Sequence, residues 1–258
     1  MPSSGPPAVF VTRPAREAQA WVQALAGLSL EALALPLIDI GPAPDVQALS
    51  SMRSRLAQFR AVMFVSANAA QGLLNGHTAW PAGTRAWVTG PGTARALREA
   101  GVPPGCIDAP AADAAQFDSE ALWAVAGPQV RPCDTVLIVR GGDASGQASG
   151  RDWLASQLEA AGAQVQVVVA YVRGVPAWSQ VQRDRARAGA QDGAWWLFSS
   201  SEAIDNLGRL LPGVGWGQAR ALCTHPRIAE RARQAGFGLI EQVRPSLEAV
   251  GGFLQSRS

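Results

Sequence analysis

Short runs of β-branched and other apolar residues alternate with segments of helical period along the whole chain. Within each run the apolar residues are nearly continuous and do not alternate with polar ones, which is typical of parallel strands covered on both faces. The pattern therefore predicts an α/β protein with parallel sheets. The expected strands lie at 8–12, 33–40, 61–66, 85–90, 135–140, 165–173, 195–200 and 219–224.

The segments between these runs end in the way that helices commonly end. A glycine follows each alanine- or leucine-rich stretch, at the position where a helix end needs a residue in the left-handed conformation. We therefore expect a positive φ angle at each of these glycines. The predicted caps are Gly27, Gly76, Gly101, Gly162 and Gly236.

Two parts of the chain repeat the same order of strand, turn and helix. VTGPGTARALREAGV, which begins at Val88, aligns with CTHPRIAERARQAGF, which begins at Cys223, at an offset of 135 residues. Upstream, FVSANA at 64–69 aligns with FSSSEA at 198–203 at an offset of 134 residues. Any two βα units share glycine and alanine caps, so one match carries little weight. Two collinear matches predict two similar domains.

Two extended stretches flanked by proline and glycine are suited to carry the chain from one domain to the other. They are PLIDIGPAP at 36–44 and AYVRGVP at 170–176. If both are crossings, residues 1–37 and 174–258 form one discontinuous α/β lobe, and residues 41–170 form an inserted second lobe.

The charge and the cysteine pattern exclude several classes of protein. The 258 residues carry a formal net charge of +2 from 22 basic and 20 acidic side chains, and this balance argues against a nucleic-acid surface. No apolar run approaches the ~20 residues of a membrane span, and the N-terminus lacks a signal-peptide pattern. Cys106, Cys133 and Cys223 are isolated, which indicates neither a zinc site nor a disulfide framework. We expect a cytoplasmic protein without a bound metal.

Each repeated turn places small or hydroxyl-bearing residues where an expected strand ends and a helix begins. Such helix starts present free N–H groups and a partial positive charge, so they can bind carboxylate or phosphate. In open α/β sheets, ligands also bind at the edge where the carboxyl ends of the strands lie. The alternative is that these residues serve only as N-caps. The turns are Ser66-Ala67-Asn68, Gly90-Pro91-Gly92-Thr93, Ser199-Ser200-Ser201 and Thr224-His225-Pro226.

Further candidates for chemistry are two glycine-rich segments and a lone tyrosine. GPGTAR at 90–95 lacks the Lys-[Ser/Thr] of a P-loop, and Arg95 stands where a dinucleotide fingerprint has its third glycine. RGGDASGQASGR at 140–151 has the composition of a surface loop. Tyr171 is the only tyrosine in the chain, and its phenol can donate a proton that tryptophan and phenylalanine cannot usefully supply. The alternative is that Tyr171 only packs, with its hydroxyl in water.

Several short motifs follow one another in a fixed order. They are Val-Thr-Arg-Pro (11–14), Phe-Val-Ser-Ala-Asn-Ala (64–69), Gly-Pro-Gly-Thr-Ala (90–94), Val-Arg-Gly (139–141) with Gly150-Arg151, Tyr171, Phe-Ser-Ser-Ser (198–201) and Pro-Arg-Ile-Ala (226–229). In this order they resemble the uroporphyrinogen-III synthase family over almost the whole length of the chain.

The resemblance implies a cofactor-free lyase of tetrapyrrole synthesis that acts on the linear tetrapyrrole hydroxymethylbilane. The family closes this substrate with inversion of ring D to uroporphyrinogen III, through azafulvene and spiro intermediates. The implied fold has two similar flavodoxin-like, three-layer α/β lobes with parallel sheets. A two-stranded linker joins the lobes, and Tyr171 is expected at the hinge beside the cleft between them. We expect a monomer that binds neither nucleic acid nor membrane.

The resemblance also implies roles for individual residues. Tyr171 is the candidate acid that protonates the departing hydroxyl of ring A. Where the second repeat of the family usually resembles Gly-x-Thr-Thr-Ala, this chain has His225-Pro226-Arg227-Ile228-Ala229, so threonine hydroxyls are absent and Arg227 is expected to supply charge. The candidate contacts for the eight substrate carboxylates are Thr12, Arg13, Ser66, Asn68, Gly90, Thr93, Arg140, Gly141, Ser200, Ser201, Thr224 and Arg227.

Two functions of other classes share parts of this pattern. A two-lobed small-molecule binding protein would have the same crossings and the same helix starts, but such proteins are ordinarily exported and no signal peptide is present. A Rossmann-type oxidoreductase would need the glycine fingerprint that Arg95 interrupts.

Overall fold

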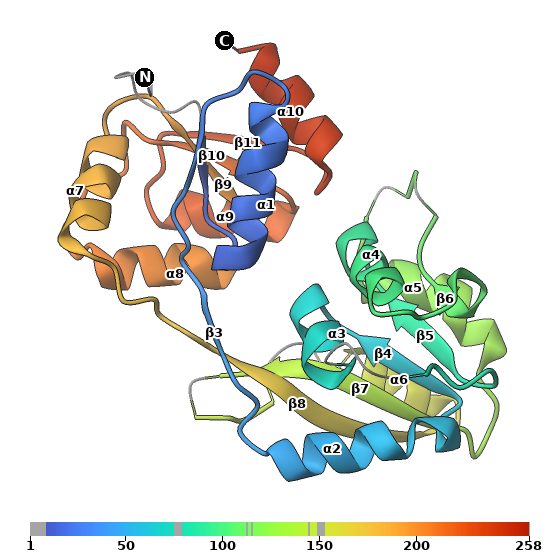
Figure 1. Cartoon of the computed structure of the whole chain (residues 1–258). Coiled ribbons are helices and arrows are strands. Elements are labelled where there is room, and N and C mark those ends of the chain that lie inside the picture. The colour runs from blue at the N-terminus through green and yellow to red at the C-terminus, as the bar shows by residue number, and fades with distance from the viewer. Residues whose placement is uncertain are drawn as a thin grey trace. The chain divides into compact units, whose positions relative to one another are not determined.

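The computed structural model describes residues 9–74, 79–111, 113–114, 116–143, 145–148 and 153–257. The chain divides into two compact units, and each is built around one sheet. Unit 1 comprises Met1–Asp39 and Val175–Ser258, and unit 2 comprises Ile40–Gly174. Strands and helices alternate along the chain (Figure 1), which confirms the predicted α/β class. Within the described ranges, no helix is long and apolar enough to cross a membrane.

The sheet of unit 1 has five parallel strands. Helix α1 (Ala15–Ala26) lies beside α10 (Leu247–Gln255), blue and red in Figure 1. Both helices bury apolar side chains in one core with Val11 of β1 and Leu197 of β9. The strands in spatial order are β2 (Ala32–Ala34), β1 (Val9–Val11), β9 (Trp195–Phe198), β10 (Arg220–Cys223) and β11 (Leu239–Gln242).

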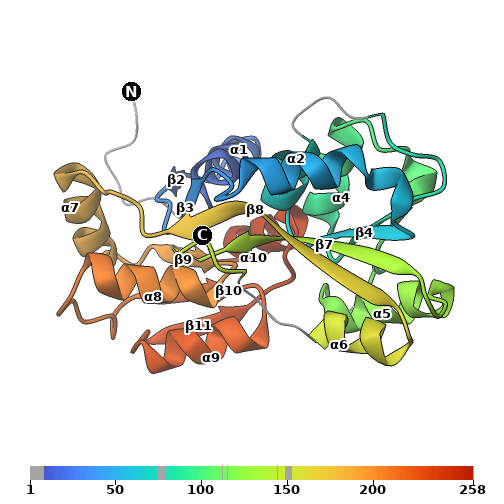
Figure 2. The same ribbon diagram turned by 90° about the horizontal axis from the view of Figure 1, so that it is seen from below.

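Aromatic rings fill the opposite face of this sheet. The ring of Trp196 on β9 lies 4.6 Å from that of Phe10 and 5.3 Å from that of Trp216, measured between centroids. Helix α7 (Gln180–Gly189) approaches so closely that a β-carbon at Gly189 would lie 2.3 Å from Cε2 of Phe10. Many of the aromatic residues of the chain therefore serve this core. Helices α8 (Ser201–Leu210) and α9 (Pro226–Gln234) lie side by side (Figure 2).

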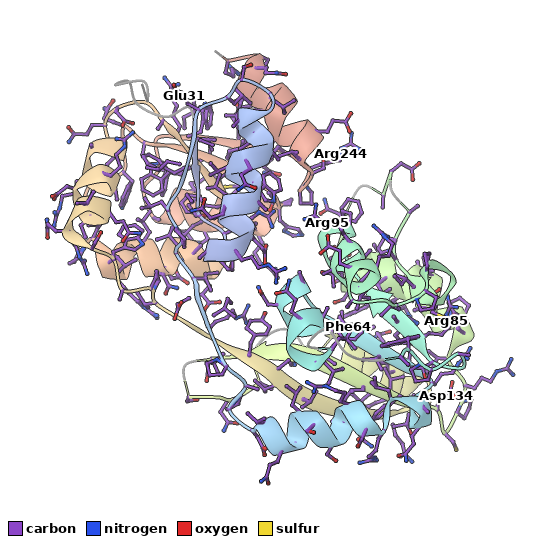
Figure 3. All side chains as sticks on the ribbon, viewed as in Figure 1. Glu31, Phe64, Arg85, Arg95, Asp134 and Arg244 are labelled. Carbon is purple, nitrogen blue, oxygen red and sulfur yellow. The ribbon has the colours of Figure 1, made fainter. Side chains whose placement is uncertain are left out.

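The sheet of unit 2 has six strands and is covered on both faces. Figure 2 shows α2 and α4 on one side of the strands and α5 and α6 on the other. Phe64 of β4 is fully buried in the core formed with α2, α3 and α4 (Figure 3), whereas Met63 faces α5 and α6. The strands in spatial order are β3 (Asp39–Gly41), β8 (Gln164–Gly174), β7 (Thr135–Gly142), β4 (Ala61–Phe64), β5 (Arg85–Val88) and β6 (Ile107–Asp108). The helices are α2 (Val46–Ser54), α3 (Ala67–Leu74), α4 (Pro91–Glu99), α5 (Ser119–Ala126) and α6 (Trp153–Ala160), with short 3-10 turns at Leu56–Gln58, Pro104–Cys106 and Gly127–Gln129.

Each sheet contains one point where the strand order reverses. In unit 1 the chain runs outward from β1 to β2 on one side and from β9 to β11 on the other, so the reversal lies between β1 and β9. In unit 2 it runs from β4 to β6 on one side and from β7 to β8 on the other, so the reversal lies between β4 and β7. Open α/β sheets bind ligands at the carboxyl ends of the strands beside such a point. The strand order therefore selects one edge of each sheet for a site.

The predicted strand at 33–40 is wrong, because the structure has two short strands there, β2 and β3. Leu35 and Leu37 are 1% and 0% exposed, so the apolar run reflects burial of the connecting segment. Pro36 has no N–H to donate to a ladder. The N–H groups of Leu35 and Leu37 still donate to the carbonyls of Val11 and Thr12, at 3.0 and 3.2 Å. The carbonyls of Pro36 and Leu37 instead accept hydrogen bonds from Trp178 Nε1 and Asn206 Nδ2, both at 2.8 Å.

The predicted left-handed cap at Gly27 is also wrong. Gly27 has a φ of −61° in the right-handed region, and the left-handed residue is Ser29, with a φ of 59°. The turn continues for two residues, because the N–H groups of Leu28 and Ser29 donate to the carbonyls of Leu25 and Ala26. The caps at Gly101, Gly162 and Gly236 are confirmed by φ angles of 88°, 83° and 89°. Gly76 lies outside the described residues.

Two edge strands have no counterpart among the predicted runs. Strand β11 is half-exposed, and β6 has only two residues, so neither produces a long apolar run. Asp108 anchors β6 by accepting hydrogen bonds from Arg85 Nε at 2.8 Å and from Trp87 Nε1 at 3.0 Å (Arg85 is labelled in Figure 3). The bond to Asp108 raises the pKa of Arg85. A polar anchor therefore replaces apolar burial at this edge.

The aligned segments of the sequence form matching elements in the two units. Strands β5 and β10 begin at residues 85 and 220, and helices α4 and α9 begin at 91 and 226, so both pairs keep the offset of 135. Helices α3 and α8 begin at 67 and 201, at the offset of 134. Both α4 and α9 start with proline, whose missing N–H would be unpaired at that position in any case.

Candidate functional site

Thr12 and Arg13 follow β1 at the reversal point of unit 1. Thr12 is 1% exposed, and its Oγ1 donates a hydrogen bond to the carbonyl of Leu197 at 2.6 Å. This bond ties the carboxyl end of β1 to that of β9. The structure therefore places Thr12 at the predicted edge, where its hydroxyl proton is donated to a backbone carbonyl of the protein.

The guanidinium of Arg13 lies among side chains of α1. Its Cζ lies 4.5 Å from the ring centroid of Trp21, and its Nη1 donates to Oε2 of Glu17 at 3.3 Å. Its Nε is buried and has no hydrogen-bond partner among the described residues. Burial lowers the pKa of Arg13, and the charge of Glu17 acts in the opposite direction. The side chain of Arg13 keeps 16% exposure and has one long ion pair, so the exposed part of its guanidinium is suited to bind a further anion.

The helix starts after β9 and β10 bring the other predicted residues of unit 1 to the same edge. Ser200 is the N-cap of α8, and its Oγ accepts a hydrogen bond from the N–H of Glu202 at 3.2 Å. Ser201 is the first residue of that helix. The N–H of Thr224 donates to the carbonyl of Phe198 at 3.1 Å, which holds Thr224 beside the end of β9. Because the carboxyl ends of parallel strands meet at one edge, these residues share it with Thr12 and Arg13.

His225 caps α9 at the turn that departs from the family pattern. Its Nδ1 accepts a hydrogen bond from the N–H of Arg227 at 3.1 Å, and Pro226 follows it as the first helical residue. An imidazole nitrogen therefore takes the place that a cap hydroxyl would have. Arg227 itself is exposed at the start of α9, so its expected role as a source of charge stays a prediction.

Ser66 and Asn68 lie at the reversal point of unit 2, just before and just after the start of α3. The N–H of Ala69 donates to Ser66 Oγ at 3.2 Å, so Ser66 caps the helix. Asn68 lies in the first turn of α3. The neighbouring strand β7 carries Arg140, which is 6% exposed, and Gly141. The structure therefore brings four predicted residues of unit 2 to adjoining strand ends.

Gly90 and Thr93 lie one strand further along, where α4 begins. Gly90 is extended, with a φ of −145°, and a β-carbon there would meet no atom within 4 Å. Thr93 is 8% exposed and belongs to the buried residues of α4. Arg95 lies on the exposed side of α4 (Figure 3), with its Nε 3.6 Å from Oε1 of Glu99. At this helix start there is free space beside Gly90, whereas the side chain of Thr93 faces inward.

Tyr171 reaches this edge of unit 2 because of a bulge in β8. Arg140 pairs with Val169 and Gly141 pairs with Tyr171, so Ala170 is an extra residue on β8. Strict alternation would point Ala170 and Tyr171 to opposite faces, yet both are buried in the core with α3. The bulge therefore turns the tyrosine ring toward α3, as bulges beside functional sites often do. Strand β8 continues beyond Tyr171 to Gly174, so the tyrosine belongs to this sheet.

The hydroxyl of Tyr171 lies next to that of Ser66. The distance between Tyr171 Oη and Ser66 Oγ is 3.1 Å, and Tyr171 is 5% exposed. The ring is packed and its hydroxyl has a hydrogen-bond partner. A phenol held in this way can donate its proton in a fixed direction.

Three residues at these edges were not predicted from the sequence. Glu17 and Trp21 lie four and eight residues after Arg13, and this spacing on a helix could have revealed both. The bulge at Ala170 has no local signal, because it depends on the register with β7. The motif residues Gly150 and Arg151 lie outside the described part of the chain.

Among the described residues, metal ligands do not gather at either edge. Across the described ranges, no three side chains of His, Cys, Asp or Glu lie together in a way that could hold a metal ion. The chemistry that the described residues can perform there is proton donation by Tyr171 and anion binding by arginine, hydroxyl and backbone N–H groups.

Comparisons with known proteins agree on one family. Residues 19–250 match the family model described as uroporphyrinogen-III synthase HemD. The chain is also similar to the solved structure of uroporphyrinogen-III synthetase from Helicobacter pylori. The two share 15% identity over 97% of this chain and 99% of that chain, with a TM-score of 0.60. A mutant uroporphyrinogen III synthase from the extremely thermophilic bacterium Thermus thermophilus is 18% identical over 97% of both chains, with a TM-score of 0.54. At these identities the structural likeness shows the fold, and the family model adds the sequence relationship.

Proposed function

The chain belongs to the uroporphyrinogen-III synthase family, and from this we propose that it converts the linear tetrapyrrole hydroxymethylbilane to uroporphyrinogen III. The reaction closes the ring and inverts ring D, with loss of one water. Because substrate and product differ only by that water, no oxidant or reductant is consumed. This balance supports a lyase without a redox cofactor, and from the family resemblance we further propose that it needs no cofactor and works in the cytoplasm as a monomer.

We propose that the groups at the two sheet edges bind the carboxylates of the substrate. The eight acetate and propionate arms carry negative charge, and the helix starts at Ser66, Gly90 and Ser200 carry N–H groups and partial positive charge. Arg13 adds a desolvated guanidinium whose Nε has no hydrogen-bond partner among the described residues. A substrate carboxylate would pair with the part of the guanidinium that stays exposed, and bonds between charged groups are the stronger ones.

The chemistry in this proposal begins with departure of the ring A hydroxyl. Tyr171 donates its proton to that oxygen, the carbon–oxygen bond breaks with its electron pair on oxygen, and water leaves. The ring A nitrogen supplies electrons to the carbon and gives up its proton, which restores the phenol, so an azafulvene remains. The substituted carbon of ring D then attacks to form a spiro intermediate, which fragments and recloses with ring D inverted. General acids of this kind typically accelerate a step by ~10² to 10⁴.

One structural observation supports the proposal in addition to family membership. The only phenol of the chain is held at the strand edge that the reversal of strand order selects, with its Oη 3.1 Å from Ser66 Oγ. The bulge also buries the ring, so what sets Tyr171 apart from a packing residue is the placement of its hydroxyl at this edge.

The experiment that tests the function is isomer analysis. Hydroxymethylbilane generated in situ is mixed with the protein, and the oxidised porphyrins are separated by chromatography. We expect the III isomer, whereas closure without an enzyme gives the I isomer. Isomer I alone at high protein concentration would contradict the proposed function.

A further inference from the structure

We propose that Ser66 is a positioning residue for Tyr171: it donates a hydrogen bond to the phenolic oxygen and so leaves the phenolic proton free for the substrate. This inference rests on the proposed function, in which Tyr171 is the acid. It concerns how the chain fixes the direction in which that acid donates. The contacts that position Tyr171 are made between α3, β7 and β8 of unit 2.

The hydrogen-bonding capacity of Ser66 allows it to donate to Tyr171 Oη. A serine hydroxyl has one proton and two lone pairs. The N–H of Ala69 donates to one lone pair, at 3.2 Å, which leaves the proton and the second lone pair for Tyr171 Oη at 3.1 Å. When the Ser66 proton points to Oη, the phenolic proton of Tyr171 must point elsewhere. The chain of donors then runs from the Ala69 N–H through Ser66 to Tyr171 and onward to the acceptor.

The start of α3 strengthens this chain of hydrogen bonds. The Ala69 N–H lies in the first turn of the helix, where the backbone carries a partial positive charge. Successive hydrogen bonds polarise one another, so the Ser66 hydroxyl becomes a better donor. After proton transfer, the same donor stabilises the negative charge left on Oη. Ser66 therefore acts through Tyr171 and needs no contact of its own with the reacting atoms.

Two glycines hold the partners at this distance. A β-carbon at Gly141 would lie 2.7 Å from Cζ of Tyr171, so only glycine leaves room for the ring beside β7. A β-carbon at Gly72 would lie 2.5 Å from the carbonyl oxygen of Ala170, so only glycine lets α3 lie so close to the bulge. Gly72 thus sets the distance from α3 to β8, and Gly141 sets the position of the ring.

A spectroscopic test reads the Ser66 contact directly. Because Tyr171 is the only tyrosine, full-length protein labelled with carbon-13 at the tyrosine ζ-carbon gives one NMR signal. We expect Ser66→Ala to shift this signal in the folded protein without substrate. Asp118→Ala is the matched control, because Asp118 caps α5 through the N–H of Ala121 at 2.9 Å and α5 packs on the other face of the sheet. The control should lose comparable stability and leave the signal in place.

Kinetics then separate positioning from direct substrate binding. We expect Ser66→Ala to lower kcat by about 3- to 10-fold, the effect of one hydrogen bond, with KM changed by less than about twofold. In a Tyr171→Phe background, Ser66→Ala should have no further effect on kcat. If Ser66→Ala does not fold, Ser66→Cys replaces it, because a thiol of similar shape is only a weak donor.

The outcomes are distinct. An unmoved NMR signal in the folded Ser66 variant overturns the inference, and so does an equal loss of kcat in both backgrounds or a loss confined to KM. Failure to produce the III isomer would instead overturn the proposed function. The NMR comparison needs no turnover, so it decides the contact between Ser66 and Tyr171 in either case.

Discussion

Gly141 lies directly beside Tyr171 in the pairing of β7 with β8, and a β-carbon at Gly141 would lie 2.7 Å from Cζ of the tyrosine ring. We predict that Gly141→Ala costs roughly 1 to 3 kcal/mol of stability, because overpacking displaces the ring. It should also lower kcat, since the phenol moves away from Ser66. Thermal melts and steady-state kinetics of the purified variant measure the two effects.

Gly252→Ala is the control for this substitution. Gly252 lies in α10, and a β-carbon there would meet no atom within 4 Å, so alanine should stabilise the helix by ~0.5 to 1 kcal/mol. Its kinetics should match the parent protein. A Gly141→Ala variant that is as stable and as active as the parent would show that the ring has room to move.

Tyr171→Phe tests the proposed acid. The substitution removes one oxygen from a packed ring, and we expect turnover to fall by ~10², near the low end for loss of a general acid, since the substrate also loses its hydroxyl without an enzyme. The melting temperature should change little. Turnover within a factor of about three of the parent, in an equally stable variant, would mean that the tyrosine only packs.

Arg13→Met tests carboxylate binding in unit 1. Loss of a hydrogen bond between charged groups, ~1.5 to 3 kcal/mol, should raise KM roughly 10- to 150-fold with little change in kcat. Stability should be nearly unchanged, because burial already disfavours the charge of Arg13. Arg16→Met is the matched control, since Arg16 lies on the exposed side of α1 and should leave KM unaltered. An unchanged KM in the Arg13 variant would remove Arg13 from the substrate contacts.

Cys223 should make the stability of the folded protein vary with pH in the alkaline range. Burial raises the pKa of this fully buried thiol from its ordinary value of 9.0 to about 12. The folded state therefore keeps a proton that the unfolded state releases, and stability should fall as pH rises from about 9 toward about 12. We expect Cys223→Ala to weaken this decline in denaturant titrations between about pH 8.5 and about pH 10.

The three-dimensional position of the cysteines also predicts their reactivity. The exposed Cys133 should react with a thiol reagent in the folded protein, whereas Cys223 should react only on unfolding. Mass spectrometry of the labelled protein, taken over time with and without denaturant, distinguishes the two sites. Equal rates for both thiols in the folded protein would contradict the burial of Cys223.

The limits of unit 2 can be tested by expressing it alone. Ile40–Gly174 is one continuous segment with its own cores on both faces of a sheet, so we expect cooperative thermal unfolding of this fragment. A fragment that ends at residue 170 lacks the last four residues of β8, including Tyr171, and should be less stable. A molten fragment 40–174 would show that the unit depends on the rest of the chain.

Much of the fold could be predicted because the causes are local. An apolar run such as 61–64 or 195–198 must be covered on both faces, so each run became a parallel strand. A helix that ends at Gly101 or Gly236 needs a left-handed residue at that point, and glycine adopts it freely. Prediction failed where residues far away in the sequence make the decisive contacts. Pro36 and Leu37 lie in an apolar run, yet their carbonyls accept hydrogen bonds from Trp178 and Asn206.

For the candidate site residues, likewise, the sequence predicted only part of their arrangement. By itself the sequence placed Ser66, Gly90, Ser200 and Thr224 at strand ends, because strand, turn and helix follow from neighbouring residues. Only the tertiary structure decided that Ser66 and Tyr171, 105 residues apart, lie 3.1 Å from each other. That contact needs the bulge at Ala170, which exists only in the register between β7 and β8. Register depends on two strands at once, so no single stretch of sequence encodes it.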